Sequence, residues 1–326
     1  MFVIPFDEFD LTFASSQRHT DMFTHLRIVI RTTFVAAAIV TSASLGWAQG
    51  TTANGSVRVD GRERTYLIDL PPQYDGRTPL PVVVVFHGGG GRAESTRTQT
   101  HMSDAGRANG FIVVYPNGTG RMRDRLLTWN TGSCCGYARN NNVNDVAFVR
   151  AMLDSIQRFY KVDAKRIYAT GLSNGGMMSH LMGCALSDRF AAIAPVSGEL
   201  SVPCKPTNPV SVLIIHGTAD KNLPYDGGPG ERALERHDVK PVQFAVESWM
   251  GFDRCATKPS VVSTADLVHT TYAKCDDGTS VELYKIIGGP HAWPKGVKLG
   301  PGLDAPSSAL DATKVIWAFF ASHPKR

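Results

Sequence analysis

The feature that most constrains the fold is a series of short, almost wholly apolar runs separated by segments of helical periodicity. The run PVVVVFHGGGG at 81–91 has four successive valines and no polar face, so a strand there must be covered on both sides. Comparable runs recur at 111–116, 166–173, 191–198, 210–220 and 280–289, and helical patterns lie at 95–108, 143–160, 176–187, 241–250 and 310–323. Strands that alternate with helices predict a mostly parallel, doubly wound α/β sheet with helices on both faces.

The residues before the first buried run predict the edge of that sheet. Apolar and polar residues alternate on either side of Asp60–Gly61, a pattern typical of an antiparallel hairpin. The chain is 43% hydrophobic and 19% charged, as expected for an ordinary globular protein. Its formal net charge of +5 comes without a run of lysine or arginine, so we expect no nucleic-acid partner.

The N-terminal segment is predicted to be a secretory signal peptide covering 1–48. Basic residues precede an apolar run that ends in small residues, and Ala48 is the expected cleavage site. A membrane anchor is the alternative, but the apolar run is short and is interrupted by Thr, Ser and Gly. Acidic residues before Met22 indicate an over-extended start, with the true start at Met22. We therefore expect a single catalytic domain at 49–326, periplasmic or extracellular and without stable membrane insertion.

Six cysteines in an exported chain suggest disulfides. We expect Cys255 to pair with Cys275, closing a loop between two elements, and Cys184 to pair with Cys204. Neighbouring cysteines cannot easily bond to each other without strain, so the partners of the adjacent Cys134 and Cys135 are left open. A metal site is the alternative, but neither a Cys-x-x-Cys pair nor a histidine cluster accompanies these residues.

The segment RIYATGLSNGG contains the candidate nucleophile, Ser173. It lies in a G-x-S-x-G motif between a predicted strand and a predicted helix, where Gly171 and Gly175 permit a sharp turn that raises the hydroxyl above the sheet. The motif is common by chance, but the position between strand and helix favours a nucleophile.

An acid and a base follow in the expected order. Asp220 comes just after the strand at 210–220, and His291 lies in a Gly/Pro-bounded loop after the last apolar strand. Ser, Asp and His in this order predict a hydrolase triad. The competing residues are Asp226 for the acid, His87 and His216, which we expect to have structural hydrogen-bonding roles, and His237, His269 and His323, which we expect at the surface.

Two backbone N–H groups are predicted to form the oxyanion hole, those of Gly89 and Asn174. Gly89 belongs to the glycine loop at 87–91, and Asn174 directly follows the nucleophile. A phosphate-binding loop is the alternative for these glycines, but the lysine and the spacing that such loops need are missing. This mechanism requires no metal and no cofactor.

The chain resembles a known family at these residues. The motifs VVVVFHGGGG, TWNTGSCCGYARNNNVNDVAFV, GLSNGGMMSHLMGCALSDRFAAIAPVSG, IIHGTADKNLPYDGG and IIGGPHAWP are similar to those of secreted polyhydroxybutyrate depolymerase-like esterases, LpqC-type proteins and feruloyl esterases of the first carbohydrate-esterase family. The resemblance implies an α/β-hydrolase fold without a separate large lid and a Ser173–Asp220–His291 esterase. Many relatives have a cysteine where this chain has Gly89.

The resemblance leaves the substrate open. Feruloyl or acetyl esters of plant polysaccharide fragments and short hydroxybutyrate-type polyesters are the expected substrates, and no protein partner is implied. Trp129 and Trp293 are candidate substrate contacts, because a flat aromatic face can hold an aromatic acyl group or a sugar ring. The alternative is that both side chains pack against neighbouring loops. The alternatives are a serine peptidase, a lipase, or an inactive hydrolase that binds carbohydrate or polymer.

Overall fold

The computed structural model describes residues 50–122, 125–235 and 237–326. The predicted signal peptide at 1–48 and the start proposed at Met22 lie outside these residues. Within them, no helix has both the length and the apolar character needed to cross a membrane.

A ten-stranded sheet forms the centre of the fold, in the order β1-β2-β4-β3-β5-β6-β7-β12-β11-β10. The strands are β1 (Thr51–Val59), β2 (Arg62–Leu70), β3 (Leu80–Phe86), β4 (Ile112–Pro116), β5 (Val162–Leu172), β6 (Ala192–Val196), β7 (Ser211–Gly217), β10 (Ser260–Ser263), β11 (Leu267–Tyr272) and β12 (Val281–Ile286). The strands from β4 to β12 in this order pair in parallel. The predicted hairpin, β1 with β2, joins this parallel part antiparallel to β4.

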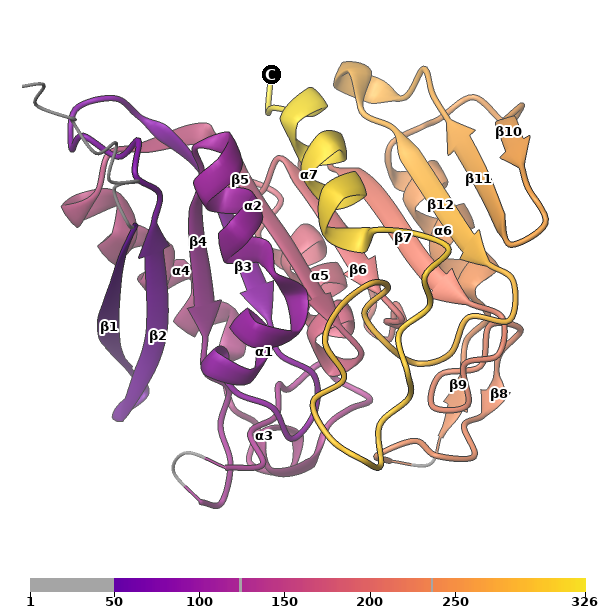
Figure 1. Ribbon diagram of the computed structural model, residues 1–326, viewed down its shortest axis with the longest axis horizontal. Coiled ribbons are helices and arrows are strands. Elements are labelled where there is room, and N and C mark those ends of the chain that lie inside the picture. Colours follow the sequence, from indigo (N-terminus) through magenta and orange to yellow (C-terminus); the bar gives the residue numbers. More distant parts are fainter. Residues whose placement is uncertain (1–49, 123–124, 236) are drawn as a thin grey trace, which may run out of the picture. The chain divides into compact units, whose positions relative to one another are not determined.

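Helices cover both faces of the sheet, as predicted. They are α1 (Ala93–Thr100), α2 (Met102–Asn109), α3 (Gly136–Asn140), α4 (Asp145–Phe159), α5 (Asn174–Ala185), α6 (Val242–Phe252) and α7 (Ala312–Ser322). Residues of α4, α5 and α6 belong to one buried cluster, and residues of α1, α2 and α7 belong to another. In Figure 1, α1, α2 and α7 lie in front of the sheet and α4, α5 and α6 lie behind it. A short pair, β8 (Gly228–Pro229) with β9 (Asp238–Val239), lies apart from the main sheet.

Strand β3 shows why the apolar runs lack alternation. Val82 and Val84 point into the cluster on the α4–α6 side, whereas Val83 and Val85 point into the other. All four are 0% exposed. Because each face of the strand meets a helical layer, every position favours an apolar side chain.

Two parts of the fold differ from the sequence prediction. The single helix expected at 95–108 is two helices, because His101 adopts a left-handed conformation with φ of 53° between them. The antiparallel strands β10 and β11, which extend the sheet beyond β12, were not predicted. All four residues of β10 are exposed, so this strand carries no run of buried apolar residues to indicate it.

The two predicted disulfides are present. Cys184 of α5 bonds Cys204, and Cys255 bonds Cys275. The expectation for Cys134 and Cys135 needs correction, because the structure joins these adjacent residues to each other. The other four cysteines of the described residues pair with one another.

We predict that replacing both Cys255 and Cys275 by serine destabilises the domain without changing its fold. The bond links the segment after α6 to the segment after β11 across a sequence separation of 20 residues. Loss of such a cross-link lowers the free energy of unfolding by about 3 kcal/mol, because the unfolded chain gains freedom. Urea denaturation without reductant measures the change, because a reductant would also break the other two disulfides. Equal midpoints for oxidised wild type and variant would contradict the prediction.

Candidate active site

Ser173 occupies a tight turn between β5, which ends at Leu172, and α5, which begins at Asn174. Its φ of 60° and ψ of −122° are rare for a residue with a side chain and fit the predicted nucleophile turn. The backbone N–H of Ser173 donates to the carbonyl oxygen of Val196 at 2.9 Å. The turn therefore holds the serine at the carboxyl edge of the sheet, where ligands bind in open α/β folds.

The glycines beside Ser173 are required by close backbone contacts. A Cβ atom at Gly171 would lie 2.6 Å from the carbonyl oxygens of both Phe86 and Gly175. A Cβ atom at Gly175 would overlap the Phe86 carbonyl oxygen as well. Only glycine lets the nucleophile turn come this close to the end of β3.

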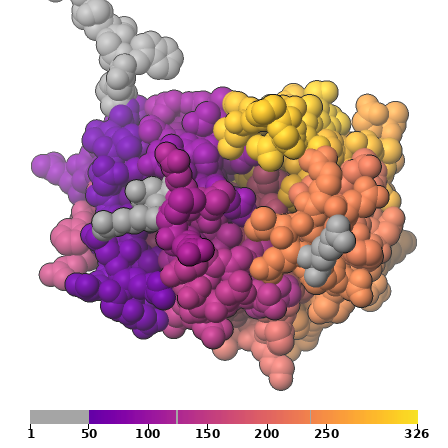
Figure 2. Space-filling view, turned by 90° about the horizontal axis from the view of Figure 1, so that it is seen from below, coloured from indigo at the N-terminus to yellow at the C-terminus, as the bar shows by residue number. Residues whose placement is uncertain are grey.

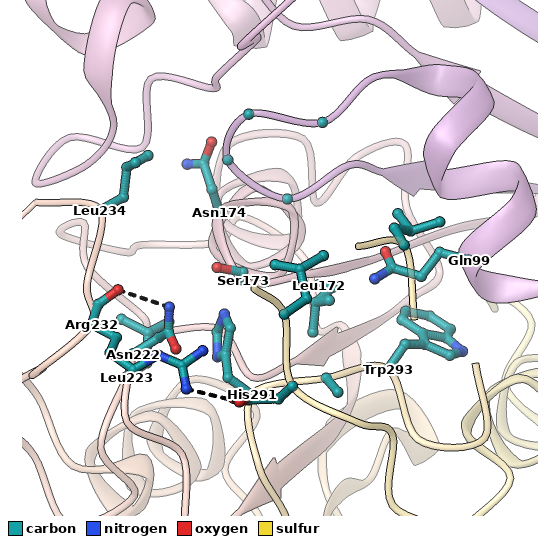
Figure 3. A pocket seen from close by; sticks show the side chains of 18 of the residues that line it. Gln99, Leu172, Ser173, Asn174, Asn222, Leu223, Arg232, Leu234, His291 and Trp293 are labelled. Carbon is teal, nitrogen blue, oxygen red and sulfur yellow. Dashed lines mark hydrogen bonds and ion pairs between the residues drawn. The ribbon is translucent and has the colours of Figure 1, made fainter. Parts of the chain in front are cut away.

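Asp220 and His291 are brought together although 71 residues separate them. The Nδ1 atom of His291 lies 2.7 Å from Oδ2 of Asp220. Oδ1 of Asp220 accepts the backbone N–H groups of Asn222 and Leu223, each at 2.8 Å. Figure 3 shows the His291 ring directed toward Ser173. With Nδ1 held by Asp220, Nε2 is the ring nitrogen that remains to take a proton from Ser173.

The electrostatics around Asp220 favour its ionised form. Burial by itself raises the pKa of this carboxyl, which is 4% exposed. The hydrogen bond and charge of His291 oppose that effect, together with the charge of His216, and the net pKa lies below the usual value. His216 places Nε2 2.8 Å from the Leu223 carbonyl oxygen, and burial lowers its own pKa. The expected structural role of His216 is thus confirmed.

His87 fixes the glycine loop that follows β3. Its Nδ1 donates to the carbonyl oxygen of Gly88 at 2.7 Å, and its Nε2 accepts the N–H of Gly118 at 2.9 Å. The two bonds require a neutral ring, and burial lowers the pKa of His87 to about 4. The structural role expected for this histidine is confirmed. It holds the loop without placing a positive charge beside the site.

The two predicted oxyanion amides lie next to each other. A Cβ atom at Gly89 would be 3.8 Å from Cβ of Asn174. Asn174 begins α5, where a backbone N–H has no partner inside the helix, and no described residue accepts the N–H of Gly89. The side chain of Asn174 is occupied elsewhere, since its Oδ1 accepts the Trp129 N–H at 2.8 Å and its Nδ2 donates to the Trp129 carbonyl oxygen at 3.1 Å. Gly89 and Asn174 therefore lie side by side next to Ser173, and neither backbone N–H has a hydrogen-bond acceptor among the described residues.

The expectation that Trp129 and Trp293 offer flat faces to a substrate is corrected. Both side chains are 0% exposed. The Trp129 indole N–H donates to the His87 carbonyl oxygen at 2.9 Å, and its ring packs against the His87 ring with centroids 4.7 Å apart. Trp293 borders the cavity, but its indole N–H donates to Thr313 at 3.0 Å and its faces are covered. Both rings therefore pack inside the protein, Trp129 against His87 and Trp293 beside Thr313.

A cavity of about 460 Å³ contains Ser173 and His291. Its walls come from the segments that follow β3, β4, β5, β7 and β12. Figure 2 shows this face, on which the magenta segment after β4, the orange segment after β7 and the yellow segment after β12 meet. The loop regions predicted at 118–142 and 221–240 both contribute lining residues, whereas the contribution of 297–306 was not anticipated.

The remaining candidates take other positions. Asp226 is exposed and does not line the cavity. His237 was expected at the surface, but it borders the cavity and its Nε2 lies 2.9 Å from Oε2 of the buried Glu199. His269 and His323 are partly buried, beside Glu282 and Ser280 respectively. In the described part of the chain, no group of three or more His, Cys, Asp or Glu side chains is arranged to hold a metal ion.

Sequence reasoning missed Arg232, Leu234 and the lining role of Cys134 and Cys135. Arg232 reaches across to Asp304 with an ion pair of 2.8 Å and so joins two loops at the cavity. These residues lie in segments without helical or strand periodicity, so their position depends on how the loops fold back. The cysteine pair did carry a signal, because two adjacent cysteines are unusual.

Comparison with known proteins supplies the family. The sequence model of the family described as "Putative esterase" matches residues 56–246, more than half of the chain. The chain belongs to this esterase family. It is 31% identical over 273 residues to the protein named "Putative esterase NocK" from Nocardia uniformis subsp. tsuyamanensis, covering 76% of each chain. This membership makes the chain a carboxylic ester hydrolase.

Two further proteins are similar to this chain. Feruloyl esterase B from Piromyces equi is 30% identical over 241 residues, covering 70% of this chain and 42% of that one, so the esterase described here spans less than half of that relative. Among solved structures, an acetyl xylan esterase from Aspergillus awamori superposes with a TM-score of 0.56 at 16% identity, covering 82% of this chain and 99% of the other. That likeness shows a shared α/β-hydrolase-type fold.

We predict that the stability of the esterase falls as the pH is lowered from about 6.5 toward 4, partly through His87. The folded state keeps this ring neutral down to about pH 4, whereas the unfolded chain takes up a proton near its ordinary value of 6.5. In this window the unfolded state binds more protons, so protonation favours unfolding. Urea denaturation across the window measures the slope, which should be shallower in His87→Gln. An equal slope in both proteins would contradict the assignment.

Proposed function

We propose that this esterase is an exported serine hydrolase that cleaves carboxylic esters through an acyl-enzyme. The observation that carries the proposal is the 2.7 Å contact between His291 and Asp220 in the cavity that contains Ser173. A serine hydroxyl attacks an ester only when a base removes its proton. Here the base is already oriented by a buried carboxylate and directed toward the serine.

The proposed reaction has two halves. The Ser173 hydroxyl oxygen attacks the ester carbonyl while His291 Nε2 takes its proton, and the carbonyl oxygen becomes an oxyanion bound by the amides of Gly89 and Asn174. The C–O bond to the alcohol then breaks, and the imidazolium returns the proton to the leaving oxygen. Water repeats the sequence, with His291 as its base, and releases the acid and free Ser173. Asp220 stabilises the imidazolium in both halves.

The substrates we propose are feruloyl or acetyl esters of plant polysaccharide fragments. Relatives named as feruloyl esterases and a structural neighbour named as an acetyl xylan esterase support this class. The cavity of about 460 Å³ has room for an aromatic acyl group and part of a sugar. Arg232 at its border has a side chain that is 43% exposed and offers N–H groups to sugar hydroxyls.

A second substrate class, oligo- or poly(3-hydroxybutyrate), is favoured by the exposed leucines near the cavity. Leu234 is 62% exposed and Leu303 is 51% exposed, and both line the cavity. Leu126, 64% exposed, lies beside the glycine loop at Gly90. Exposed apolar side chains grouped around a site are typical of contact with an apolar partner, and a solid polyester surface is such a partner.

Export is proposed from the leader predicted at 1–48 together with the three disulfides of the described residues. Disulfides persist in oxidising compartments and are rare in the cytosol. The periplasm or the extracellular medium is therefore the proposed location.

We predict that Asp220→Asn lowers kcat by about 10⁴-fold, because asparagine no longer holds the imidazole in the reactive tautomer. Hydrolysis of 4-nitrophenyl acetate measures the loss. Asp226→Asn is the matched control, since this exposed carboxyl lies outside the cavity, and it should retain wild-type activity. A large loss in the control instead would show that the acid has been assigned to the wrong residue.

We also predict that a fluorophosphonate labels Ser173 and that Ser173→Ala abolishes both labelling and hydrolysis. Mass spectrometry of the labelled protein identifies the modified residue. Rates on methyl ferulate, acetylated xylooligosaccharides and a hydroxybutyrate trimer, compared side by side, decide between the two substrate classes. A folded, unlabelled protein without activity on any of these esters would support the inactive binding protein, and cleavage of peptides alone would support the peptidase.

A further inference from the structure

The disulfide between Cys134 and Cys135 lies in the wall of the active-site cavity. Both residues border the cavity together with Ser173, although they are only 4% and 2% exposed. The triad and the oxyanion amides make no use of this pair. The position of the disulfide in the cavity wall therefore suggests contact with the substrate.

The neighbours of the disulfide are apolar and belong to the elements that carry the catalytic residues. The two cysteines form a separate buried cluster with Met177, Leu223 and Val239. Met177 is one helical turn after the nucleophile, and its N–H donates to the Ser173 carbonyl oxygen at 2.8 Å. Leu223 follows the acid, and its N–H donates to Asp220 at 2.8 Å. This wall is therefore fixed relative to Ser173 and Asp220.

Hydrogen bonds on both sides hold the cysteine pair in place. The Cys135 N–H donates to the Trp129 carbonyl oxygen at 3.0 Å, the same oxygen that accepts the Asn174 side chain. The Cys134 carbonyl oxygen accepts the Thr131 hydroxyl at 2.7 Å. On the other side, the N–H of the following residue, Gly136, donates to Glu235 at 2.7 Å. The wall is thus already formed before a substrate arrives, so binding would cost little ordering of the loop.

We propose that the Cys134–Cys135 disulfide, with Met177 and Leu223, forms the surface that binds the acyl group of the ester. The inference rests on the proposed function and names the part of the cavity that selects its substrate. Figure 3 shows the cavity extending to both sides of Ser173, with Leu223 and Leu234 on one side and Gln99 and Trp293 on the other. The disulfide packs with Leu223 and so belongs to the first side.

The chemistry of this wall suits an aromatic acyl group. Three of its side chains contribute sulfur, which is polarizable and makes favourable contacts with aromatic rings. The acyl group stays bonded to Ser173 during the reaction, so a surface fixed to the same helix can hold it through both halves. The wall offers little to an acetyl group, which is too small to extend across it.

The test replaces the wall without touching the triad. In Cys134→Ala/Cys135→Ala, kcat/KM for 4-nitrophenyl ferulate should fall by about tenfold, mainly through KM, which is typical of a lost apolar contact. The kcat/KM for 4-nitrophenyl acetate, which has the same leaving group, should change by less than about twofold. Cys255→Ser/Cys275→Ser is the matched control, because it removes a disulfide outside the cavity and should leave the ratio of the two rates unchanged.

A second variant covers the case in which the double variant fails to fold. Met177→Ala shortens the same wall and should lower the ferulate rate selectively in the same way. Equal losses on both esters, or no loss on either, in the folded variants would overturn the proposal. The proposal would also be overturned if the variants changed only the ratio of kcat/KM for ethyl acetate to that for phenyl acetate. These esters differ only in the alcohol, so the wall would then contact the leaving group.

The fluorophosphonate reaction separates this inference from the proposed function. If wild-type Ser173 is not labelled, the proposed mechanism itself fails. If Ser173 is labelled at the same rate in wild type and wall variants but the ferulate-to-acetate ratio does not change, the mechanism stands and the acyl-binding role of the disulfide is wrong.

Discussion

The close approach of the nucleophile turn to the end of β3 is the constraint on which the rest of the site depends. Gly171 and Gly175 leave no space for a Cβ atom beside the Phe86 carbonyl oxygen. This contact sets the glycine loop after β3 next to Ser173 and thereby brings the amides of Gly89 and Asn174 together. A larger residue at either glycine would separate the Ser173 hydroxyl from the amides proposed to bind the oxyanion, even with Asp220 and His291 in place.

The sheet and its helices could be predicted because burial of a strand on both faces leaves a continuous apolar run in the sequence. Strands such as β3 are buried on both faces, so their sequence is continuously apolar and their positions could be predicted. Strand β10 could not be predicted, because its exposed residues carry no such signal. The break at His101 was also missed, since the helical pattern continues through it while the backbone turns.

At the site, too, some features leave a pattern in the sequence and others do not. Ser173, Asp220 and His291 each follow a strand, and the parallel sheet brings such positions to one edge, so their order was informative. The tryptophans were misjudged because a polar loop sequence does not reveal that the loop folds over Trp129 and covers it. The bond between Cys134 and Cys135 could not be predicted for a related reason, since the sequence does not show the loop that holds these adjacent residues.

Asn174 connects the proposed reaction rate of the esterase with its proposed acyl selectivity. Its backbone N–H is proposed as part of the oxyanion hole, while its side chain hydrogen-bonds both backbone groups of Trp129, from which the cysteine loop continues. Substitution at this position would therefore disturb rate and selectivity together. The loop beyond Trp129, in contrast, can diverge while those two hydrogen bonds persist. Descendants of one ancestral esterase could exchange acyl preferences through that loop and inherit the chemical step unchanged.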